Sequence, residues 1–271
     1  MKHEVIRLYG NDPRVTLTSY IHSDVAELRM PPRPAIIVLP GGGLSFLSER
    51  EAEPVALEFL SRGINVFILR YSIGEFGHYP LPLLDASLAV TYVRRHAGEY
   101  NIDPRKIYTL GFSAGGYVAA MLGVRWHEPF IREELDIAIG ENRPDGLILA
   151  YPVITAGKYA HRGTINVSIG DDADEDELDA HSLELLVSDK TPPTFLWHTA
   201  DDSAVPVENS LLFAHALSEN NVPFELHVYP TGAHGMSLAT RQTSCGNRGL
   251  ESARISGWTS LAAAWVNDDK R

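Results

Sequence analysis

The sequence predicts one domain of the α/β class over residues 1–271, in which helices cover both faces of a mostly parallel sheet and an antiparallel hairpin lies at the N-terminal side. Short β-branched or aromatic runs alternate with longer helical patterns along most of the chain, which is typical of strand–helix–strand units in a parallel sheet. The first two runs are instead separated by the turn sequence NDPR, which favours a hairpin. The chain has 271 residues and is 44% hydrophobic, enough for one large core or two small ones.

The strands are predicted from apolar runs, and the helices from a period of 3.6 residues between stop signals. PAIIVLP is continuously apolar, as expected for a strand buried on both faces. The next helix places Val55 and Phe59 on one face and ends near Gly63. Predicted strands span 4–10, 15–21, 34–40, 64–71, 106–112, 146–153, 194–200 and 224–230, and predicted helices span 50–63, 83–100, 206–221 and 251–269, with one more starting near residue 115.

One segment, residues 155–190, interrupts this alternation. It contains the acidic run DDADEDELD and little apolar periodicity. We expect its carboxylates to lie on a solvated loop. Because long insertions often cover a binding site, the segment is also a candidate lid.

The net charge of the chain indicates which classes of partner are disfavoured, and its cysteine content bears on the cellular compartment. The net charge is −12, which disfavours nucleic acids and anionic membranes. Cys245 is the single cysteine of the sequence, so no intrachain disulfide can form. The N-terminal residues do not resemble a signal peptide, and no apolar run is long enough to span a membrane. We therefore expect a cytoplasmic protein; its oligomeric state is not predicted.

The sequence GFSAG predicts a nucleophile at Ser113. This pattern follows a predicted strand and precedes a predicted helix, the context that the G-x-S-x-G motif requires. Glycine at 111 and 115 permits close approach of strand and helix, so the serine can occupy a strained turn with its oxygen exposed. A turn of small residues made only for packing is the alternative, which the flanking elements disfavour.

An acid and a base follow in the order that such a nucleophile needs. His234 lies after a predicted strand among small residues, and is the only one of eleven histidines so placed. A neutral imidazole can take the serine proton and return it to the leaving group. Asp202 is the preferred third member because Val205 and Pro206 open the next helix three residues later. Asp201 is the alternative, with a loop-bracing role otherwise, and we expect His198 to make a structural hydrogen bond.

The glycine-rich loop LPGGGLSF supplies candidates for an oxyanion site. Bare backbone amides can face a developing negative charge. Gly42 and Gly43 are the candidates from this loop, and Ala114, directly after the nucleophile, is the third. The loop lacks the ending of a phosphate-binding loop, and no cluster of residues has metal-ligand spacing, so we expect no metal.

Taken together, PGGG, GFSAGG, HTADDSAVP and GAHG resemble the α/β-hydrolase fold esterases, most closely the carboxylesterase and acetyl-xylan-esterase-like branch. The likeness runs from about residue 34 to 266. Pro40 departs from the pattern, because related esterases have a histidine there that braces the loop. The resemblance implies a catalytic triad with Ser113 as nucleophile, Asp202 as acid and His234 as base. It also implies that the oxyanion donors are the amides of Gly42, Gly43 and Ala114. It also implies short acyl esters as substrates, with acetylated plant sugars as candidates.

The predicted function is that of a cofactor-free serine esterase that acts on a small-molecule ester, such as an acetylated xylo-oligosaccharide, through an acyl-enzyme. Phe46 and Tyr151 follow strand ends and are candidates for the acyl pocket. A serine peptidase of the same fold is one alternative. A ligand-binding homologue without turnover is another, because function can be lost while a fold persists.

Overall fold

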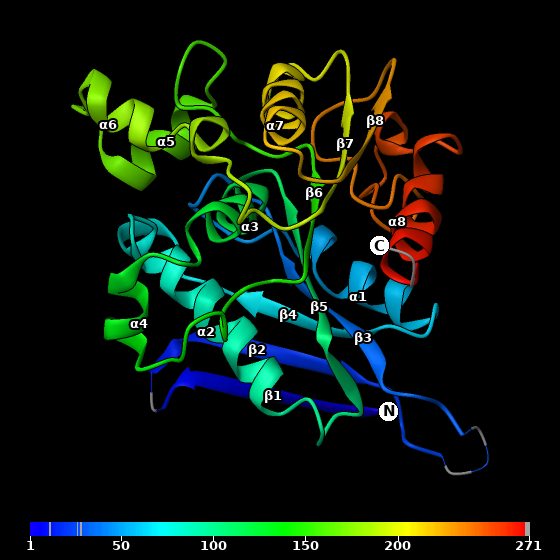
Figure 1. Ribbon diagram of the computed structural model, residues 1–271. Helices are drawn as coiled ribbons and strands as arrows, with labels where there is room; N and C mark the ends of the chain where they lie inside the picture. Colours follow the sequence, from blue (N-terminus) through cyan, green and yellow to red (C-terminus); the bar gives the residue numbers. More distant parts are fainter. Residues whose placement is uncertain (11, 26, 28, 269–271) are drawn as a thin grey trace.

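One eight-stranded sheet organises the part of the chain that the computed structural model describes, residues 1–10, 12–25, 27 and 29–268 (Figure 1). β1 and β2 form the predicted hairpin, β2 also pairs antiparallel with β4, and the other neighbours are parallel. The predicted fold class is confirmed. The order across the sheet is β1 (Lys2–Tyr9), β2 (Asp12–Ile21), β4 (Asn65–Arg70), β3 (Arg33–Leu39), β5 (Ile102–Phe112), β6 (Gly146–Ala150), β7 (Thr194–Thr199) and β8 (Phe224–Tyr229).

Helices cover both faces of the sheet, and each face has its own apolar core. Side chains alternate along β3, so that Ile37 packs into one core while Ile36 and Val38 pack into the other, as the strand period of two requires. The Ile37 core includes α2 (Leu81–Arg95), α3 (Ala114–Arg125) and α7 (Glu208–Glu219). The opposite core includes α1 (Glu53–Leu60) and α8 (Trp258–Val266).

The acidic segment is helical where the sequence led us to expect a loop. It forms α5 (Arg162–Ile169), α6 (Glu175–Ala180) and the 3-10 turn η4 (Leu183–Leu186). Asp174 and Glu177 form a reciprocal capping box at the start of α6, each side chain accepting the other's backbone N–H. Such a cap satisfies amides that would otherwise lack partners, which stabilises a helix without a strong apolar stripe. The carboxylates are exposed, as expected.

Other boundaries also differ from the prediction. The last helix begins at Trp258, after the 3-10 turns η5 (Arg248–Leu250) and η6 (Ile255–Gly257), and position 269 of its predicted range lies outside the described residues. The helix α4 (Pro129–Leu135) and the 3-10 turn η3 (Gly74–Phe76) also lie outside the predicted ranges, and the predicted helix 50–63 is preceded by the separate 3-10 turn η2 (Glu49–Glu51). No helix within the described ranges is both long and apolar enough to cross a membrane.

The chain order places a crevice at the carboxyl ends of β3 and β5. After β3 the chain moves to β4 on one side, and it then crosses back to β5 on the other side of β3. Sheets of this type bind ligands where the order reverses. The glycine loop follows β3 and Ser113 follows β5, while the loops of Asp202 and His234 follow β7 and β8 at the same edge.

Candidate active site

Ser113 lies in a strained turn between β5 and α3. Its φ of 52° and ψ of −117° are unusual for a residue with a side chain. Its amide donates to the Ala150 carbonyl at 3.0 Å, which fixes the turn to the neighbouring strand β6. A Cβ added to Gly111 would lie 2.3 Å from the Gly115 carbonyl oxygen, and a Cβ added to Gly115 would lie 2.1 Å from the Leu39 carbonyl oxygen. Both flanking positions therefore require glycine.

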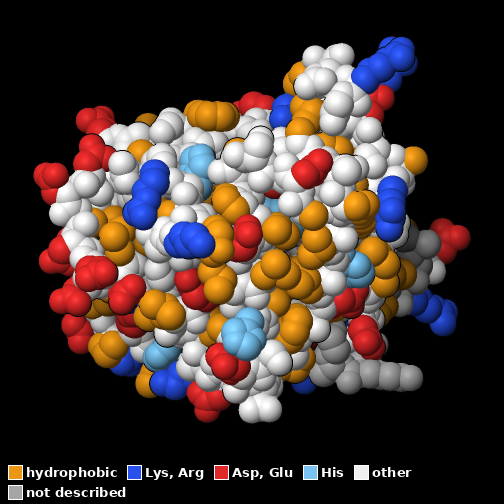
Figure 2. Space-filling view, turned by 90° about the horizontal axis from the view of Figure 1, so that it is seen from above, with side chains coloured by type: hydrophobic (Ala, Val, Ile, Leu, Met, Phe, Trp, Pro, Cys, Tyr) orange, Lys and Arg blue, Asp and Glu red, His pale blue; other side chains and the backbone are white. Residues whose placement is uncertain are grey.

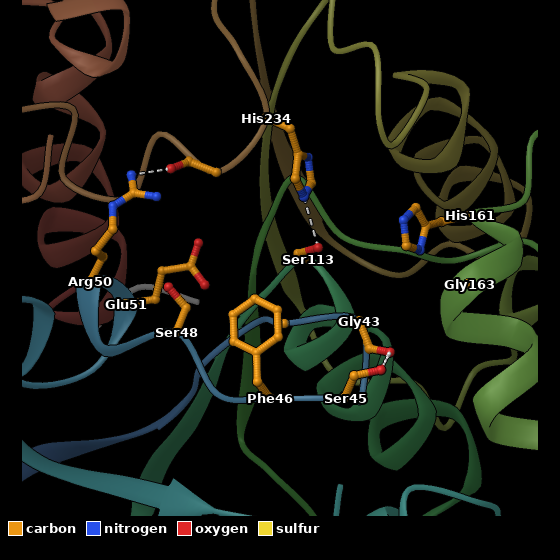
Figure 3. A pocket seen from close by; sticks show the side chains of 12 residues that line it. Gly43, Ser45, Phe46, Ser48, Arg50, Glu51, Ser113, His161, Gly163 and His234 are labelled. Atoms are coloured by element: carbon orange, nitrogen blue, oxygen red, sulfur yellow. Dashed lines mark hydrogen bonds between the residues drawn. The ribbon is translucent and has the colours of Figure 1, made fainter. Parts of the chain in front are cut away.

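His234 joins Ser113 to Asp202, so the three predicted triad residues lie together. Figure 3 shows the hydrogen bond between His234 and Ser113. His234 Nε2 lies 2.8 Å from Ser113 Oγ, and its Nδ1 lies 2.7 Å from Asp202 Oδ2. An ionised carboxylate can only accept, so Nδ1 carries the proton and Nε2 is free to accept the serine hydroxyl. The arrangement can therefore remove a proton from Ser113.

Asp202 is held in its ionised form. Burial opposes the charge, but the nearby His198 ring, whose Nε2 lies 3.5 Å from Oδ2, and the hydrogen bonds from His234 and the Val205 amide outweigh it and keep the pKa of this carboxyl well below its usual range. The Ala204 and Val205 amides donate to Oδ1, each at 2.9 Å. His198 has its own structural partners, the Ser210 hydroxyl at 2.8 Å and the Val205 carbonyl at 2.9 Å. With the two amides on Oδ1 and His198 bonded elsewhere, Oδ2 of Asp202 is left to accept the hydrogen bond of His234 Nδ1.

The loop that carries His234 is fixed by neighbouring side chains. Asp201, the rejected candidate for the acid, accepts from the Gly232 amide at 2.7 Å, which is the bracing role expected of it. The Thr199 hydroxyl donates to the Gly232 carbonyl at 2.7 Å. The Tyr151 ring packs edge-on against the imidazole with centroids 5.1 Å apart. The imidazole is thus supported from the loop and from the interior.

The glycine loop lines the same cavity with Gly42 and Gly43. Gly42 has φ of 135° and Gly43 has φ of 64°, conformations that side chains rarely allow. Within the described part of the chain, the amides of Gly42, Gly43 and Ala114 donate to no other residue. These N–H groups are available to a bound oxygen, as an oxyanion site requires.

Glu51, for which the sequence predicted no role, braces this loop. Its buried carboxylate accepts from the Gly41 amide at 2.9 Å and from the Tyr151 hydroxyl at 2.6 Å. Burial raises the pKa of Glu51, opposed mainly by these two hydrogen bonds. The Tyr71 hydroxyl donates to the Pro40 carbonyl at 2.6 Å. Together Glu51 and Tyr71 anchor the glycine loop at Gly41 and Pro40.

The two candidates for the acyl pocket differ in position. Phe46 lines the cavity and is 61% exposed. Tyr151 does not line it: the residue is 1% exposed, and its hydroxyl is occupied by Glu51 and by the Ser237 amide. This differs from the expectation, because the backbone turns at Tyr151 with φ of 39° and the ring lies beneath the site. Tyr151 is placed to support His234 and Glu51.

The cavity around Ser113 has a volume of about 500 Å³ and is lined by both polar and apolar groups. Arg50 lies on one side and His161, from the start of α5, lies on the other, with Ser113 and His234 between them (Figure 3). Arg50 donates to the carbonyls of Thr243 and Gly235 at 2.5 and 2.6 Å. The described residues include no group of three or more His, Cys, Asp or Glu side chains arranged to hold a metal ion. The lining residues are Gly42, Gly43, Ser45, Phe46, Ser48, Arg50, Glu51, Ser113, His161, Gly163, His234 and Gly235.

Comparison with known proteins places this geometry among esterases. The model of the BD-FAE family matches residues 25–217. Endo-1,4-beta-xylanase B of Butyrivibrio fibrisolvens is 42% identical over 90% of this chain, and an acetylxylan esterase of Xylanibacter ruminicola is 30% identical over 76%. The aligned regions span 38% and 42% of those two relatives. The acetyl ester-xyloside bifunctional hydrolase of Caldicellulosiruptor lactoaceticus superimposes with a TM-score of 0.82 at 39% identity, covering 97% of this chain and 94% of that one.

Proposed function

The chain belongs to the BD-FAE family, and on this premise we propose that it is a serine esterase that removes acetyl groups from xylan-derived sugars. One observation carries the proposal: the continuous hydrogen-bond chain from Ser113 Oγ through His234 to Asp202, at 2.8 and 2.7 Å. The acetyl ester and the sugar are suggested by the relatives, which include an acetylxylan esterase and an acetyl ester-xyloside hydrolase.

In the proposed reaction, Ser113 Oγ attacks the acyl carbonyl carbon while His234 Nε2 takes the hydroxyl proton. The carbonyl oxygen becomes an anion, which the amides of Gly42, Gly43 and Ala114 stabilise. His234 then protonates the departing alcohol oxygen, leaving acetyl-Ser113. Water attacks this ester with His234 again as base, and acetate and free Ser113 result. Throughout the reaction, Asp202 accepts the hydrogen bond of His234 Nδ1–H and stays ionised.

We also propose that residues 155–190 cover one side of the site. α5 brings His161 and Gly163 to the cavity that holds Ser113, which supports a covering role for this part of the segment. α6 lies farther out beside α5 (Figure 1).

The test is acetate release from 4-nitrophenyl acetate and from acetylated xylobiose by the wild type and by Ser113→Ala. Loss of the nucleophile should lower kcat at least about 10³-fold on both substrates, because the residual rate depends on binding and oxyanion stabilisation alone. Ser218→Ala, at an exposed helical serine, is the matched control and should retain full activity. Equal rates for Ser113→Ala and the wild type would refute the proposal.

A further inference from the structure

His161 is a cavity side chain that the proposed reaction does not use. We propose that it determines specificity, its Nε2–H donating a hydrogen bond to an oxygen in the alcohol portion of the substrate. The inference rests on the proposed esterase function and adds a contact for the sugar. It depends on three features: the proton position on the imidazole, the open face of Nε2, and the number of acceptor oxygens in an acetylated sugar.

The start of α5 fixes the proton of His161 on Nε2. The Thr164 amide donates to His161 Nδ1 at 3.2 Å, the hydrogen bond that caps this helix. Thr164 Oγ1 lies 2.8 Å from the same nitrogen. A nitrogen that accepts an N–H bond carries no proton, so the neutral ring is protonated on Nε2. Burial, with His234 as the next cause, lowers the pKa of His161, so the ring is neutral at neutral pH.

The Nε2–H of His161 faces the cavity and has no partner within the described ranges of the protein. The two hydrogen bonds of this side chain both involve Nδ1. Its ring lies beside the glycine loop, since a Cβ on Gly43 would be 4.0 Å from Cε1, and the close-up shows it across from His234 (Figure 3). A molecule bound next to Ser113 is therefore the acceptor that this donor can reach.

The chemistry of an acetyl ester indicates that the acceptor for His161 Nε2–H lies in the alcohol portion of the substrate. The acetyl group has one free acceptor, its carbonyl oxygen, and three backbone amides are already available for it. The hydroxyl and ring oxygens of a sugar all belong to the alcohol portion. His161 is unsuited to be a second base because its exposed nitrogen carries the proton, and no described carboxylate bonds to the ring. A site built to donate to such oxygens discriminates against alcohols that lack them.

The experiment compares kcat/KM for acetylated xylobiose with that for 4-nitrophenyl acetate, whose alcohol portion has no hydroxyl groups like those of a sugar. In His161→Phe the ring is kept and the donor is lost, so the ratio of the two values should fall about five- to ten-fold, mainly through KM for the sugar. His161→Gln places an amide N–H near the position of Nε2 and should restore part of the ratio. Asn166→Ala, at an exposed position of α5, should leave the ratio at the wild-type value.

A second measurement uses the Ser113→Ala variant, which keeps His161, so that misfolding of the His161 variants cannot affect the result. The ¹⁵N spectrum of its histidine rings should contain one Nε2-protonated ring whose signal moves when unacetylated xylobiose is added. The inference would be overturned by an unchanged ratio in His161→Phe, or by an equal fall in kcat/KM for both substrates. Histidine ring signals that do not shift when xylobiose is added would also overturn it. A wild type inactive on both esters would instead refute the proposed function, and the spectrum would still test the contact.

Discussion

Two buried carboxylates beside Ser113 have opposite pKa shifts, and the difference is explained by their hydrogen-bond donors. Asp202 accepts from two backbone amides and from His234, and its pKa is lowered despite burial. Glu51 accepts from one amide and one tyrosine hydroxyl, and burial raises its pKa. Asp202 is thus suited to a constant negative charge beside the imidazole. Glu51 is suited to position backbone and does not contact the triad by a hydrogen bond.

Replacing Glu51 should reduce turnover more than substrate affinity. In Glu51→Gln the amide NH₂ must face either the Gly41 N–H or the Tyr151 hydroxyl, so one donor loses its acceptor. The glycine loop would then hold the Gly42 and Gly43 amides less firmly, and we expect kcat to fall about ten- to a hundred-fold with a smaller change in KM. Steady-state kinetics on 4-nitrophenyl acetate measure this split. Glu53→Gln, exposed at the start of α1, is the matched control, and similar kcat values for the two variants would contradict the bracing role.

At the scale of elements, the position of Ser113 depends on how closely α3 approaches the sheet. Gly115, in the first turn of α3, packs against the backbone of β3, and Gly111 at the end of β5 packs against Gly115. Both contacts are backbone to backbone, so no flexible side chain can move aside. The helix must lie this close for the turn at Ser113 to have its strained geometry.

Gly115→Ala should therefore destabilise the fold as well as abolish activity. Its Cβ would lie 2.1 Å from the Leu39 carbonyl oxygen, and relief requires α3 to move away from β3, at a cost of about 2 kcal/mol or more in the free energy of unfolding. Denaturant unfolding monitored by circular dichroism measures this cost. At Gly98, where an added Cβ meets nothing within 4 Å, alanine should change stability by less than about 0.5 kcal/mol. Equal stability of the two variants would show that α3 adjusts freely.

The strands, and the meeting of Ser113, Asp202 and His234 at one edge of the sheet, could be predicted from sequence because their signals are local. A continuous apolar run such as that of β3 is sufficient to identify a buried strand, and G-x-S-x-G encodes both the turn at Ser113 and its flanking elements. Glu51 and His161 gave no such signal. Glu51 becomes a brace only because β6 brings Tyr151, a hundred positions later, to its carboxylate. The capping box of α6 was present in the sequence, but its acidic residues suggested a solvated loop instead.

At the scale of the whole molecule, charge is distributed unevenly around the site. The chain has a net charge of −12, and in Figure 2 acidic side chains gather on the side where α6 lies in Figure 1. The exposed carboxylates in α6 and just before it are Asp171, Asp172, Asp174, Glu175, Asp176, Glu177 and Asp179. Arg50 is the one Lys or Arg among the described residues that line the cavity, and Glu51 lies beside it. An approaching molecule therefore meets a negative field before it can meet the guanidinium.

The rate of capture should consequently depend on the charge of the ester and on salt. We expect kcat/KM for 4-acetoxybenzoate, an anion, to rise about two- to five-fold as ionic strength increases from about 10 to 300 mM, because the Debye length falls from about 30 Å to well below 10 Å and screens the repulsion. Methyl 4-acetoxybenzoate has the same acetyl group and no charge, so its kcat/KM should change little. Acetate release at several salt concentrations gives both values. A fall with salt for the anion alone would mean that the local charge of Arg50 outweighs the field of the whole molecule.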